Sequence, residues 1–243
     1  MSVGLPEREV IVGLLHPGEM GSAVGEAIDG EVVWASEGRS EETRARAARF
    51  RDVATVTALC NEADVILSIC PPHAAVEVAH ACAGFSGIYV DANAISPQRA
   101  QEVATLHARF VDGGIVGGPP TEPGTTLYLS GDDAETVAAL FTGSPLATRQ
   151  VANASAVKMA YAAWSKGTTA MLLAIRDVAR ANGIEDEWQL AAPELAERLP
   201  RAERAKAKKG WRWIGEMEEI ADTFAAAGQP DGFHRAAAEV YRS

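Results

Sequence analysis

Six residues near the N-terminus have the spacing of a phosphate-binding turn: His16, Pro17, Gly18, Glu19, Met20 and Gly21. A dinucleotide-binding fingerprint reads G-x-G-x-x-G; its second glycine lets the backbone approach the pyrophosphate, and its third lets the helix pack on the sheet. Gly18 and Gly21 occupy these two places, and His16 replaces the first glycine. Pro17 presets its φ and can form the turn differently. The stretch predicts a pyrophosphate site at a helix start, and an ordinary strand-to-helix loop is the alternative.

The stretch WASEGRS, residues 34–40, bears on the choice of cofactor. An NAD-type site places a carboxylate after the second strand to accept a hydrogen bond from the ribose, and Glu37 lies near that place. Arg39 and Ser40 instead offer a cation and a hydroxyl to a 2′-phosphate, with Arg44 one turn further on. We therefore expect NADP(H) to be preferred over NAD(H). The alternative is that Arg39 and Arg44 only begin a solvated helix.

Both stretches need a scaffold that gathers strand ends, and the first part of the chain predicts one. Runs rich in Val, Ile and Leu alternate there with helical patterns. The expected strands are residues 9–15, 31–36, 63–70, 87–93, 109–117 and 125–131. The expected helices are residues 21–28, 40–50, 74–83 and 96–108, with Ser40 as an N-cap. The alternation implies an α/β fold, with a Rossmann-type doubly wound parallel sheet over residues 1–151.

The sequence after residue 151 predicts a small all-α domain over residues 152–243. Its first helix, which starts in ANASAVK, is expected to run for about 28 residues, or about 40 Å, and to end at Asn182-Gly183. Three more helices are expected around residues 187–199, 210–227 and 231–242. The expected architecture is therefore a dinucleotide-binding domain followed by a helical domain, which a long interdomain helix leads.

Four stretches between residues 68 and 167 occur in an order that resembles a known family. They are SICPPHAAVEV, YVDANAISP, FVDGGIVGG and SAVKMAYAAWSKG, with the matching residues Cys70, Pro71, Pro72, Asn93, Gly117, Gly118 and Lys158. With the turn at residues 16–21 they resemble the β-hydroxyacid dehydrogenase superfamily, which includes 3-hydroxyisobutyrate and 6-phosphogluconate dehydrogenases. The tail resembles a short C-terminal domain of unassigned function found on some relatives.

The resemblance implies a role for each matched residue. The turn would hold the pyrophosphate, Pro71 would lie beside the nicotinamide ribose, and Cys70 and Pro72 would also bind the cofactor. Asn93 would contact both cofactor and substrate. Residues 117–118 would form the substrate loop, and Lys158 would be the catalytic lysine.

The sequence departs from the family pattern in the substrate loop and after the lysine. Val116 stands where the family usually has a serine, and Tyr161 and Ala162 stand where it often has an asparagine. Two polar groups that would face a substrate are therefore absent, which argues against a plain 3-hydroxy acid. Val116 and Tyr161 are still substrate-site candidates, since the Tyr161 hydroxyl can serve as a donor.

Lys158 could supply the proton that hydride transfer to a carbonyl requires. Burial lowers the pKa of a lysine, and a well-placed proton partner contributes about 10²–10⁴-fold in rate. Its neighbours Val157, Met159 and Ala160 are apolar, as expected in a cleft, whereas a solvated lysine at a helix end is the alternative. The expected function is an NADP(H)-dependent oxidoreductase acting on a small hydroxy or carbonyl compound with an anionic group. An imine reductase and a nucleotide-binding protein without turnover are the alternatives.

The long helix also predicts a homodimer. Its stretches MAYAAW and AMLLAI are apolar around most of the helix, and the remaining tail is too short to cover it. Pairing two copies would bring His234 to the neighbouring site as a substrate-binding residue, although a lone histidine is more often a packing residue. Lys166 could bind a substrate anion or reach solvent.

Composition limits the other partners. The formal net charge is −11, which argues against binding to nucleic acid or an anionic membrane, since both need a basic face. Cys60, Cys70 and Cys82 lack the spacing of a metal site, so no metal is expected. Neither a signal peptide nor a membrane-spanning run is expected. We expect a cytoplasmic enzyme whose partners are a small-molecule substrate and a second copy of the chain.

Overall fold

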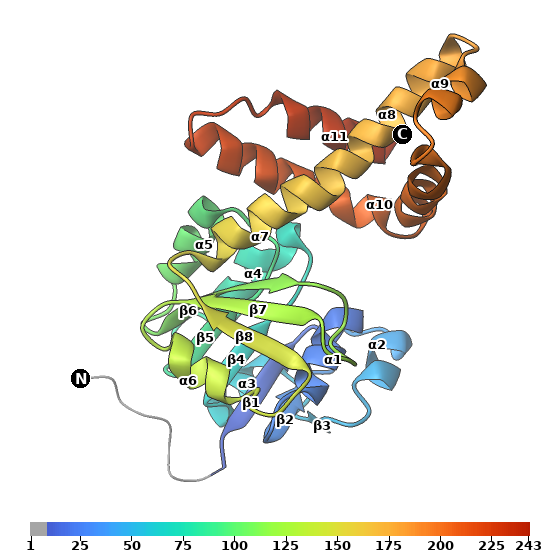
Figure 1. The fold of residues 1–243 in the computed structure, drawn as a ribbon. Coiled ribbons are helices and arrows are strands. Elements are labelled where there is room, and N and C mark those ends of the chain that lie inside the picture. Colours follow the sequence, from blue (N-terminus) through green and yellow to red (C-terminus); the bar gives the residue numbers. More distant parts are fainter. Residues whose placement is uncertain (1–8) are drawn as a thin grey trace. The chain divides into compact units, whose positions relative to one another are not determined.

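The computed structural model describes residues 9–243, which divide into two compact units between Lys158 and Met159. Figure 1 shows a sheet with helices in the N-terminal unit and helices alone in the C-terminal unit. The division falls inside a helix, whereas the expected domain boundary, between residues 151 and 152, precedes that helix. Residues 1–8 of the expected first domain lie outside the described residues.

The N-terminal unit is built on an eight-stranded sheet with the order β3-β2-β1-β4-β5-β6-β7-β8. Its strands are β1 (Ile11–Leu15), β2 (Glu31–Trp34), β3 (Arg51–Asp52), β4 (Val65–Ser68), β5 (Ile88–Asp91), β6 (Phe110–Val116), β7 (Thr125–Ser130) and β8 (Leu146–Gln150). The predicted Rossmann-type α/β fold is confirmed, but the β6–β7 pair is antiparallel. The connection over residues 117–124 is too short for the crossover that a parallel pair needs.

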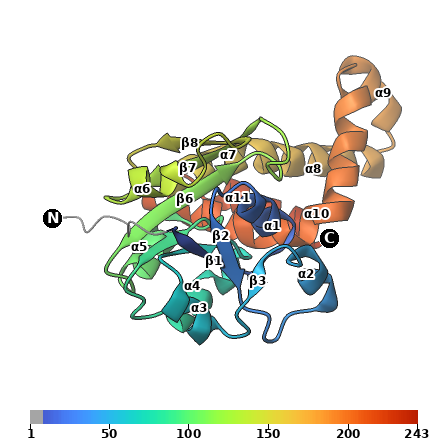
Figure 2. The same cartoon turned by 90° about the horizontal axis from the view of Figure 1, so that it is seen from below.

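Helices cover both faces of this sheet, as a doubly wound fold requires (Figure 2). They are α1 (Glu19–Glu26), α2 (Glu41–Arg46), α3 (Val56–Glu62), α4 (Ala75–Ala81), α5 (Pro97–Ala104) and α6 (Ala134–Ala139). Buried residues of α1 and α6 pack on one face of the sheet, and those of α3, α4 and α5 pack on the other. Two apolar layers therefore hold the strands in place.

Local sequence signals account for several helix starts. The Ser40 hydroxyl accepts a hydrogen bond from the Thr43 backbone N–H at 3.3 Å, which confirms the expected N-cap of α2. Ser96 caps α5 in the same way, with Pro97 in the first turn. The sequence reasoning missed β3, α3, α6 and β8. These elements are short, and tertiary packing rather than a long periodic pattern forms them.

The C-terminal unit is helical in the part of the chain described. Helix α7 (Ala154–Ala162), which begins in the N-terminal unit, continues through a π-helical turn, Ala163–Gly167, into α8 (Thr168–Ala181). The predicted end of the long helix at Asn182-Gly183 is confirmed, since Gly183 has a φ of +66°. The helices that follow are α9 (Glu185–Ala191), α10 (Leu195–Ala226) and α11 (Gly232–Arg242).

The prediction of separate helices around residues 187–199 and 210–227 is wrong. Helix α10 runs without a break through Pro200 and Gly210. Pro200 lies early in the helix and removes one backbone hydrogen bond. Burial of Leu195, Leu199 and Ala202 around it offsets that loss. Packing has overridden a local helix-breaking signal.

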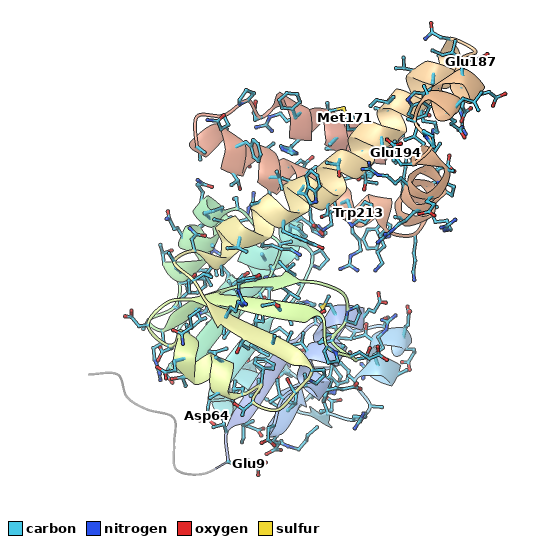
Figure 3. The ribbon with its side chains drawn as sticks, in the orientation of Figure 1. Glu9, Asp64, Met171, Glu187, Glu194 and Trp213 are labelled. Atoms are coloured by element: carbon cyan, nitrogen blue, oxygen red, sulfur yellow. The ribbon has the colours of Figure 1, made fainter. Side chains whose placement is uncertain are left out.

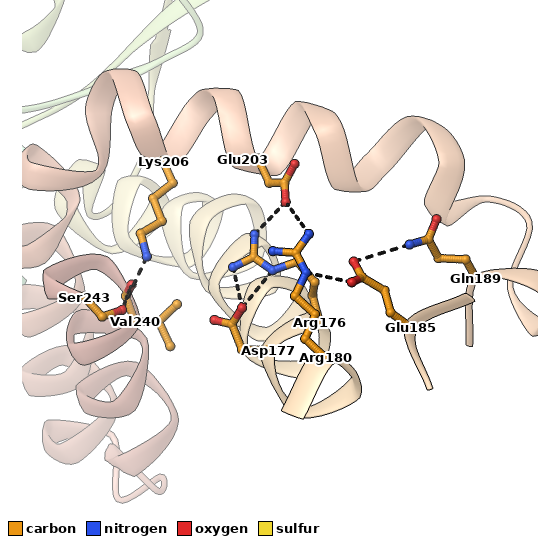
Figure 4. A network of polar contacts seen from close by, with 9 residues as sticks. All are labelled: Arg176, Asp177, Arg180, Glu185, Gln189, Glu203, Lys206, Val240 and Ser243. Atoms are coloured by element: carbon orange, nitrogen blue, oxygen red, sulfur yellow. Dashed lines mark hydrogen bonds and ion pairs between the residues drawn. The ribbon is translucent and has the colours of Figure 1, made fainter. Parts of the chain in front are cut away.

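Polar contacts reinforce the apolar packing of the C-terminal unit. Arg176 on α8 pairs with Glu203 on α10 at 2.7 Å, and Figure 4 shows Arg180 on the same carboxylate. The Lys166 ammonium pairs with the Glu216 carboxylate and lies 5.8 Å from the ring centre of Trp213, which Figure 3 labels. Lys166 therefore neutralises a buried carboxylate of its own unit, and the expectation that it reaches solvent or a substrate anion is replaced by this ion pair.

Candidate functional site

The turn after β1 lies at the sheet edge where the parallel strands end. Gly18 is the N-cap of α1 with no side-chain cap, and its N–H donates to the His16 carbonyl at 2.7 Å. A Cβ on Gly21 would lie 2.8 Å from that same carbonyl oxygen, so glycine is required for the close approach of helix and turn. A Cβ on Gly18 would meet no atom closer than 4.0 Å. The turn thus has a tight wall at Gly21 and an open face at Gly18.

His16 has left-handed backbone geometry with a φ of +62°, which few residues other than glycine, Asn, Asp and His adopt readily. Burial and the nearby Arg39 guanidinium lower its pKa to about 4, so the imidazole is neutral at pH 7. Its buried Nδ1 atom lacks a hydrogen-bond partner within the described chain. The histidine therefore fills the place of the first glycine and brings a polar atom to the site.

Arg39 follows β2 and approaches the same region. Burial lowers its pKa, and its charge acts on both His16 and Cys70. The buried Nε atom has no hydrogen-bond partner in residues 9–243. Ser40 is exposed and serves as the cap of α2, while Arg44 donates to the Ser36 carbonyl at 2.8 Å. Of these residues, Arg39 has a buried donor atom without a partner in the described chain, and this atom is available to an anion.

Asn93 ties the ends of β4 and β5 together. Its Oδ1 accepts a hydrogen bond from the Cys70 backbone N–H at 2.5 Å, and its Nδ2 donates to Ser68 and to Asp91 at 3.1 and 2.9 Å. Asn93 is 2% exposed. These bonds position the backbone that leads into Pro71, and Pro72 then begins a single 3₁₀ turn. Contact of Asn93 and residues 70–72 with a cofactor or substrate stays a prediction.

Lys158 is held against β6 by the way α7 begins. The Ser155 backbone N–H and hydroxyl donate to the Asp112 carboxylate, the former at 2.8 Å, and the Ala154 N–H donates to Ser130 at 3.0 Å. A Cβ on Gly114 would lie 2.6 Å from the Ala154 carbonyl oxygen, so the helix rests directly on the strand. The Lys158 ammonium donates to the Ile115 carbonyl at 2.8 Å.

Sequence reasoning missed the groups that dock α7, although the sequence contained a signal for them. Asp112, Gly113 and Gly114 interrupt an otherwise apolar strand. A carboxylate and two glycines inside a buried strand indicate that another backbone approaches closely. Their effect is to set the Lys158 ammonium beside the Ile115 carbonyl of β6, one residue before Val116.

The predicted substrate loop begins where β6 ends. Val116 is the last residue of the strand and is partly buried. Gly117 has a φ of +129°, and a Cβ there would collide with Thr125. The Thr125 hydroxyl donates to the Gly118 carbonyl at 2.7 Å, while the Gly118 Cα faces open space. Glycine is therefore required at position 117, where the chain reverses from β6 into the antiparallel β7. A role of Gly117 or Gly118 in substrate binding stays a prediction.

Tyr161 and His234 belong to the C-terminal unit. Tyr161 is 45% exposed on α7. His234, on α11, is buried with its ring 4.4 Å from that of Phe224 in an edge-to-face contact. The structure therefore gathers residues 16–21, 39, 70–72, 93, 116–118 and 158 in one unit and leaves these two residues in the other. Their role at a substrate stays a prediction.

The chain matches the family described as "Domain of unknown function (DUF1932)" over residues 179–243. A protein of Methanothermus fervidus described as "Uncharacterized 28.5 kDa protein in 7S RNA 5'region" is 28% identical over 189 residues, which cover 72% of this chain and 73% of that protein.

Solved structures resemble the whole chain. Conserved protein MTH1747 of unknown function, described as structurally similar to 3-hydroxyacid dehydrogenases, is 26% identical with a TM-score of 0.70, covering 96% of this chain and 97% of that one. The Mycobacterium tuberculosis 3-hydroxyisobutyrate dehydrogenase is 16% identical with a TM-score of 0.66, covering 97% and 93%. A reductive aminase from Aspergillus terreus, in complex with NADPH and ethyl-5-oxohexanoate, is 14% identical with a TM-score of 0.60, covering 96% and 92%.

These findings confirm the resemblance to the β-hydroxyacid dehydrogenase superfamily and the resemblance of the tail to a domain of unassigned function. Among residues 9–243, no group of three His, Cys, Asp or Glu side chains could hold a metal ion. No helix in the same range is long and apolar enough to cross a membrane.

Proposed function

We propose that the protein is an NADP(H)-dependent oxidoreductase that transfers a hydride between the nicotinamide and a small hydroxy or carbonyl compound with an anionic group. The observation that carries the proposal is the position of the Lys158 ammonium, 2.8 Å from the Ile115 carbonyl near the end of β6. The glycine turn with His16 follows β1, and Arg39 follows β2, the parallel neighbour of β1. The partnerless atoms of His16 and Arg39 therefore lie at the sheet edge where these parallel strands end. Such an edge is where doubly wound folds bind ligands.

The residues at this edge fit a dinucleotide. The open face at Gly18 and the N-terminal amides of α1 suit a pyrophosphate, because backbone N–H groups and the helix dipole favour an anion there. The Arg39 guanidinium suits the 2′-phosphate that distinguishes NADP(H) from NAD(H). A bound nicotinamide would supply or accept the hydride.

Lys158 has the proton-transfer role in this proposal. Its hydrogen bond to Ile115 fixes the ammonium next to Val116 and the glycine loop, where a carbonyl oxygen of a substrate would be placed. From there it donates a proton to the oxygen during reduction and accepts one during oxidation. Val116 supplies an apolar contact in place of the hydroxyl usual in the family, which favours a substrate other than a plain 3-hydroxy acid.

A screen of aldehydes, keto acids and imines for NADPH and NADH consumption tests the function. We expect turnover with a carbonyl compound that bears an acidic group and a preference for NADPH. Turnover confined to imines would replace the proposal by the imine reductase alternative. Tight NADPH binding without turnover of any compound would replace it by a nucleotide-binding protein without catalysis.

We also propose that the protein acts as a homodimer in the cytoplasm. Five large apolar side chains are exposed along α7, the π-helical turn and α8, and they define the exposed apolar stripe: Tyr161, Trp164, Met171, Ile175 and Val178. They recur over several turns, and an apolar strip of this length on a folded protein marks an interface. The matching stripe of a second copy is the simplest partner, since a two-fold axis pairs a surface with itself.

Light scattering tests the assembly. We expect a dimer at micromolar concentration, and Trp164→Glu should produce a monomer because it places a charge in the stripe. Glu187→Gln, which changes an exposed side chain on α9, is the control and should leave the dimer intact. A parent protein that is monomeric and fully active would contradict this proposal.

A further inference from the structure

A pocket of about 410 Å³ lies wholly within the C-terminal unit, between the π-helical turn, α8, the start of α10 and the start of α11. Its volume is in the range of sites for small organic molecules, about 300–1,000 Å³. Its lining includes none of the residues that we assign to dinucleotide binding at the ends of the parallel strands. We name it the His234 pocket.

The walls of the His234 pocket are mainly apolar. Met171, Leu172 and Ile175 from α8 form one side, and Phe233 from α11 forms another. Met171 and Phe233 remain 50% and 63% exposed, so apolar side chains stand at the mouth as well as inside. Figure 3 labels Met171 at this position on α8. These walls suit the hydrocarbon part of a ligand.

His234 brings a polar group to this apolar wall. The residue is 8% exposed, and its Nδ1 atom has no hydrogen-bond partner among the described residues. Burial lowers its pKa, which favours the neutral form of the ring. A buried polar atom without a partner is costly in a folded protein and is explained when a ligand supplies the missing bond.

The π-helical turn makes room for the His234 ring. A Cβ on Gly167 would lie 3.2 Å from the ring Cε1 and 3.3 Å from Nδ1, so the histidine rests against bare backbone. Side-chain hydroxyls of Thr168 and Thr169 bond carbonyls of this turn, at 2.5 and 2.8 Å. π-Helical turns inside α-helices occur frequently at functional sites. The π-helical turn and His234 therefore fit against each other and together form one wall of the pocket.

Arg198 gives the pocket a positive edge. Among the described residues that line it, Arg198 is the charged one. No ion pair joins Arg198 to another residue in the range 9–243, although the chain as a whole carries a net charge of −11. Arg198 therefore has a guanidinium that no carboxylate of the described chain neutralises, and it stands beside an apolar pocket. This combination suits a ligand that is apolar along its length and anionic at one end.

We propose that the His234 pocket binds a medium-chain carboxylate. The hydrocarbon chain lies along Met171, Leu172 and Ile175, the carboxylate pairs with Arg198, and His234 supplies the second polar contact. All residues that line this pocket belong to the C-terminal unit, and the proposal does not depend on hydride transfer. Because Met171 and Ile175 also belong to the exposed apolar stripe, a side chain from a second copy is the competing occupant.

Calorimetry of the intact protein with octanoate, without any cofactor, tests the proposal. We expect saturable binding, and weaker binding by about tenfold or more for 1-octanol and octylamine, which lack the negative charge. Arg198→Gln should weaken octanoate binding by about tenfold, whereas Arg201→Gln, an exposed arginine three residues along α10, should not. No saturable binding, or equal binding of octanol and octanoate, would overturn the proposal.

A second measurement places the ligand. The chain has five histidines, so the ¹H–¹³C signal of the His234 ring can be assigned with the His234→Phe variant. We expect octanoate to shift this signal, and thermal melting checks that each variant is folded. A signal that moves only in the Trp164→Glu monomer would show that a second copy fills the pocket in the dimer, and the proposal would then be wrong. Binding without any shift at His234 would equally rule out this pocket.

Discussion

In the N-terminal unit most candidate residues follow the ends of parallel strands, and Lys158 lies on α7, which docks on β6. In the C-terminal unit the candidate residues project from helices that apolar packing and a few ion pairs hold together. The strand ends carry their groups to a common edge by backbone hydrogen bonding, and the Asn93 and Asp112 networks then fix individual side chains. The helical unit holds His234 and Lys166 through contacts between α8, α10 and α11. A sheet edge therefore concentrates polar groups, while the helical unit forms an apolar pocket with few.

The largest expected effect tests the N-terminal half of this comparison. Lys158→Ala should lower turnover by about 10²-fold or more, because it removes the proton partner, and should leave NADPH affinity nearly unchanged. Steady-state kinetics and cofactor titration measure the two effects. Tyr161→Phe removes the neighbouring candidate hydroxyl on the same helix, and we expect it to lower turnover much less than Lys158→Ala does. If Lys158→Ala keeps turnover within threefold of the parent, another group carries the proton.

A smaller effect tests whether close packing of α7 on β6 positions the lysine. Gly114→Ala places a Cβ 2.6 Å from the Ala154 carbonyl oxygen, and we expect the free energy of unfolding to fall by about 1–3 kcal/mol. Gly232→Ala is the control, because no atom lies within 4 Å of its added Cβ. Urea denaturation measures both. Equal stability of the two variants would mean that the helix is not held directly on the strand.

The buried histidine of the turn predicts a dependence of stability on pH. Burial and Arg39 lower the folded-state pKa of His16 to about 4, below the usual 6.5, so the unfolded chain binds a proton first as the pH falls. Stability should therefore decrease from pH 6.5 toward pH 4, with His16 contributing about 1–2 kcal/mol of that loss.

The His16→Asn variant isolates this contribution, since asparagine tolerates a positive φ. Denaturation at pH 7 and pH 4 should show a smaller loss of stability for His16→Asn than for the parent. His80→Asn, at an exposed histidine on α4, should behave as the parent. The same loss in His16→Asn and the parent would show that other groups, such as the buried His107, dominate the acid response.

The smallest expected effect concerns the choice of cofactor. NADPH should bind about tenfold more tightly than NADH, or about 1.4 kcal/mol, and Arg39→Ala should abolish the difference. Arg44→Ala is the control, because Arg44 already donates to the Ser36 carbonyl. Quenching of tryptophan fluorescence measures each affinity. A preference for NADH in the parent would give the ribose-binding role to Glu37 instead.

The alternation of apolar strands and helical patterns determined the Rossmann-type unit from sequence, because each signal is local to a single element. The turn at residues 16–21 and the cap at Ser40 were readable for the same reason, since each depends on neighbours within a few positions. The long helix up to Asn182-Gly183 was equally clear from its pattern and its glycine stop.

Tertiary structure decided what depends on residues far apart in the chain. Lys158 meets Ile115, and Asn93 meets Cys70, across separations that no local pattern records. The passage of α10 through Pro200 likewise depends on packing, because burial against other helices outweighs one lost hydrogen bond. Local propensities contribute tenths of a kcal/mol to about 3 kcal/mol per residue. Burial of apolar side chains contributes a comparable or larger free energy, so tertiary packing decides the structure where the two conflict.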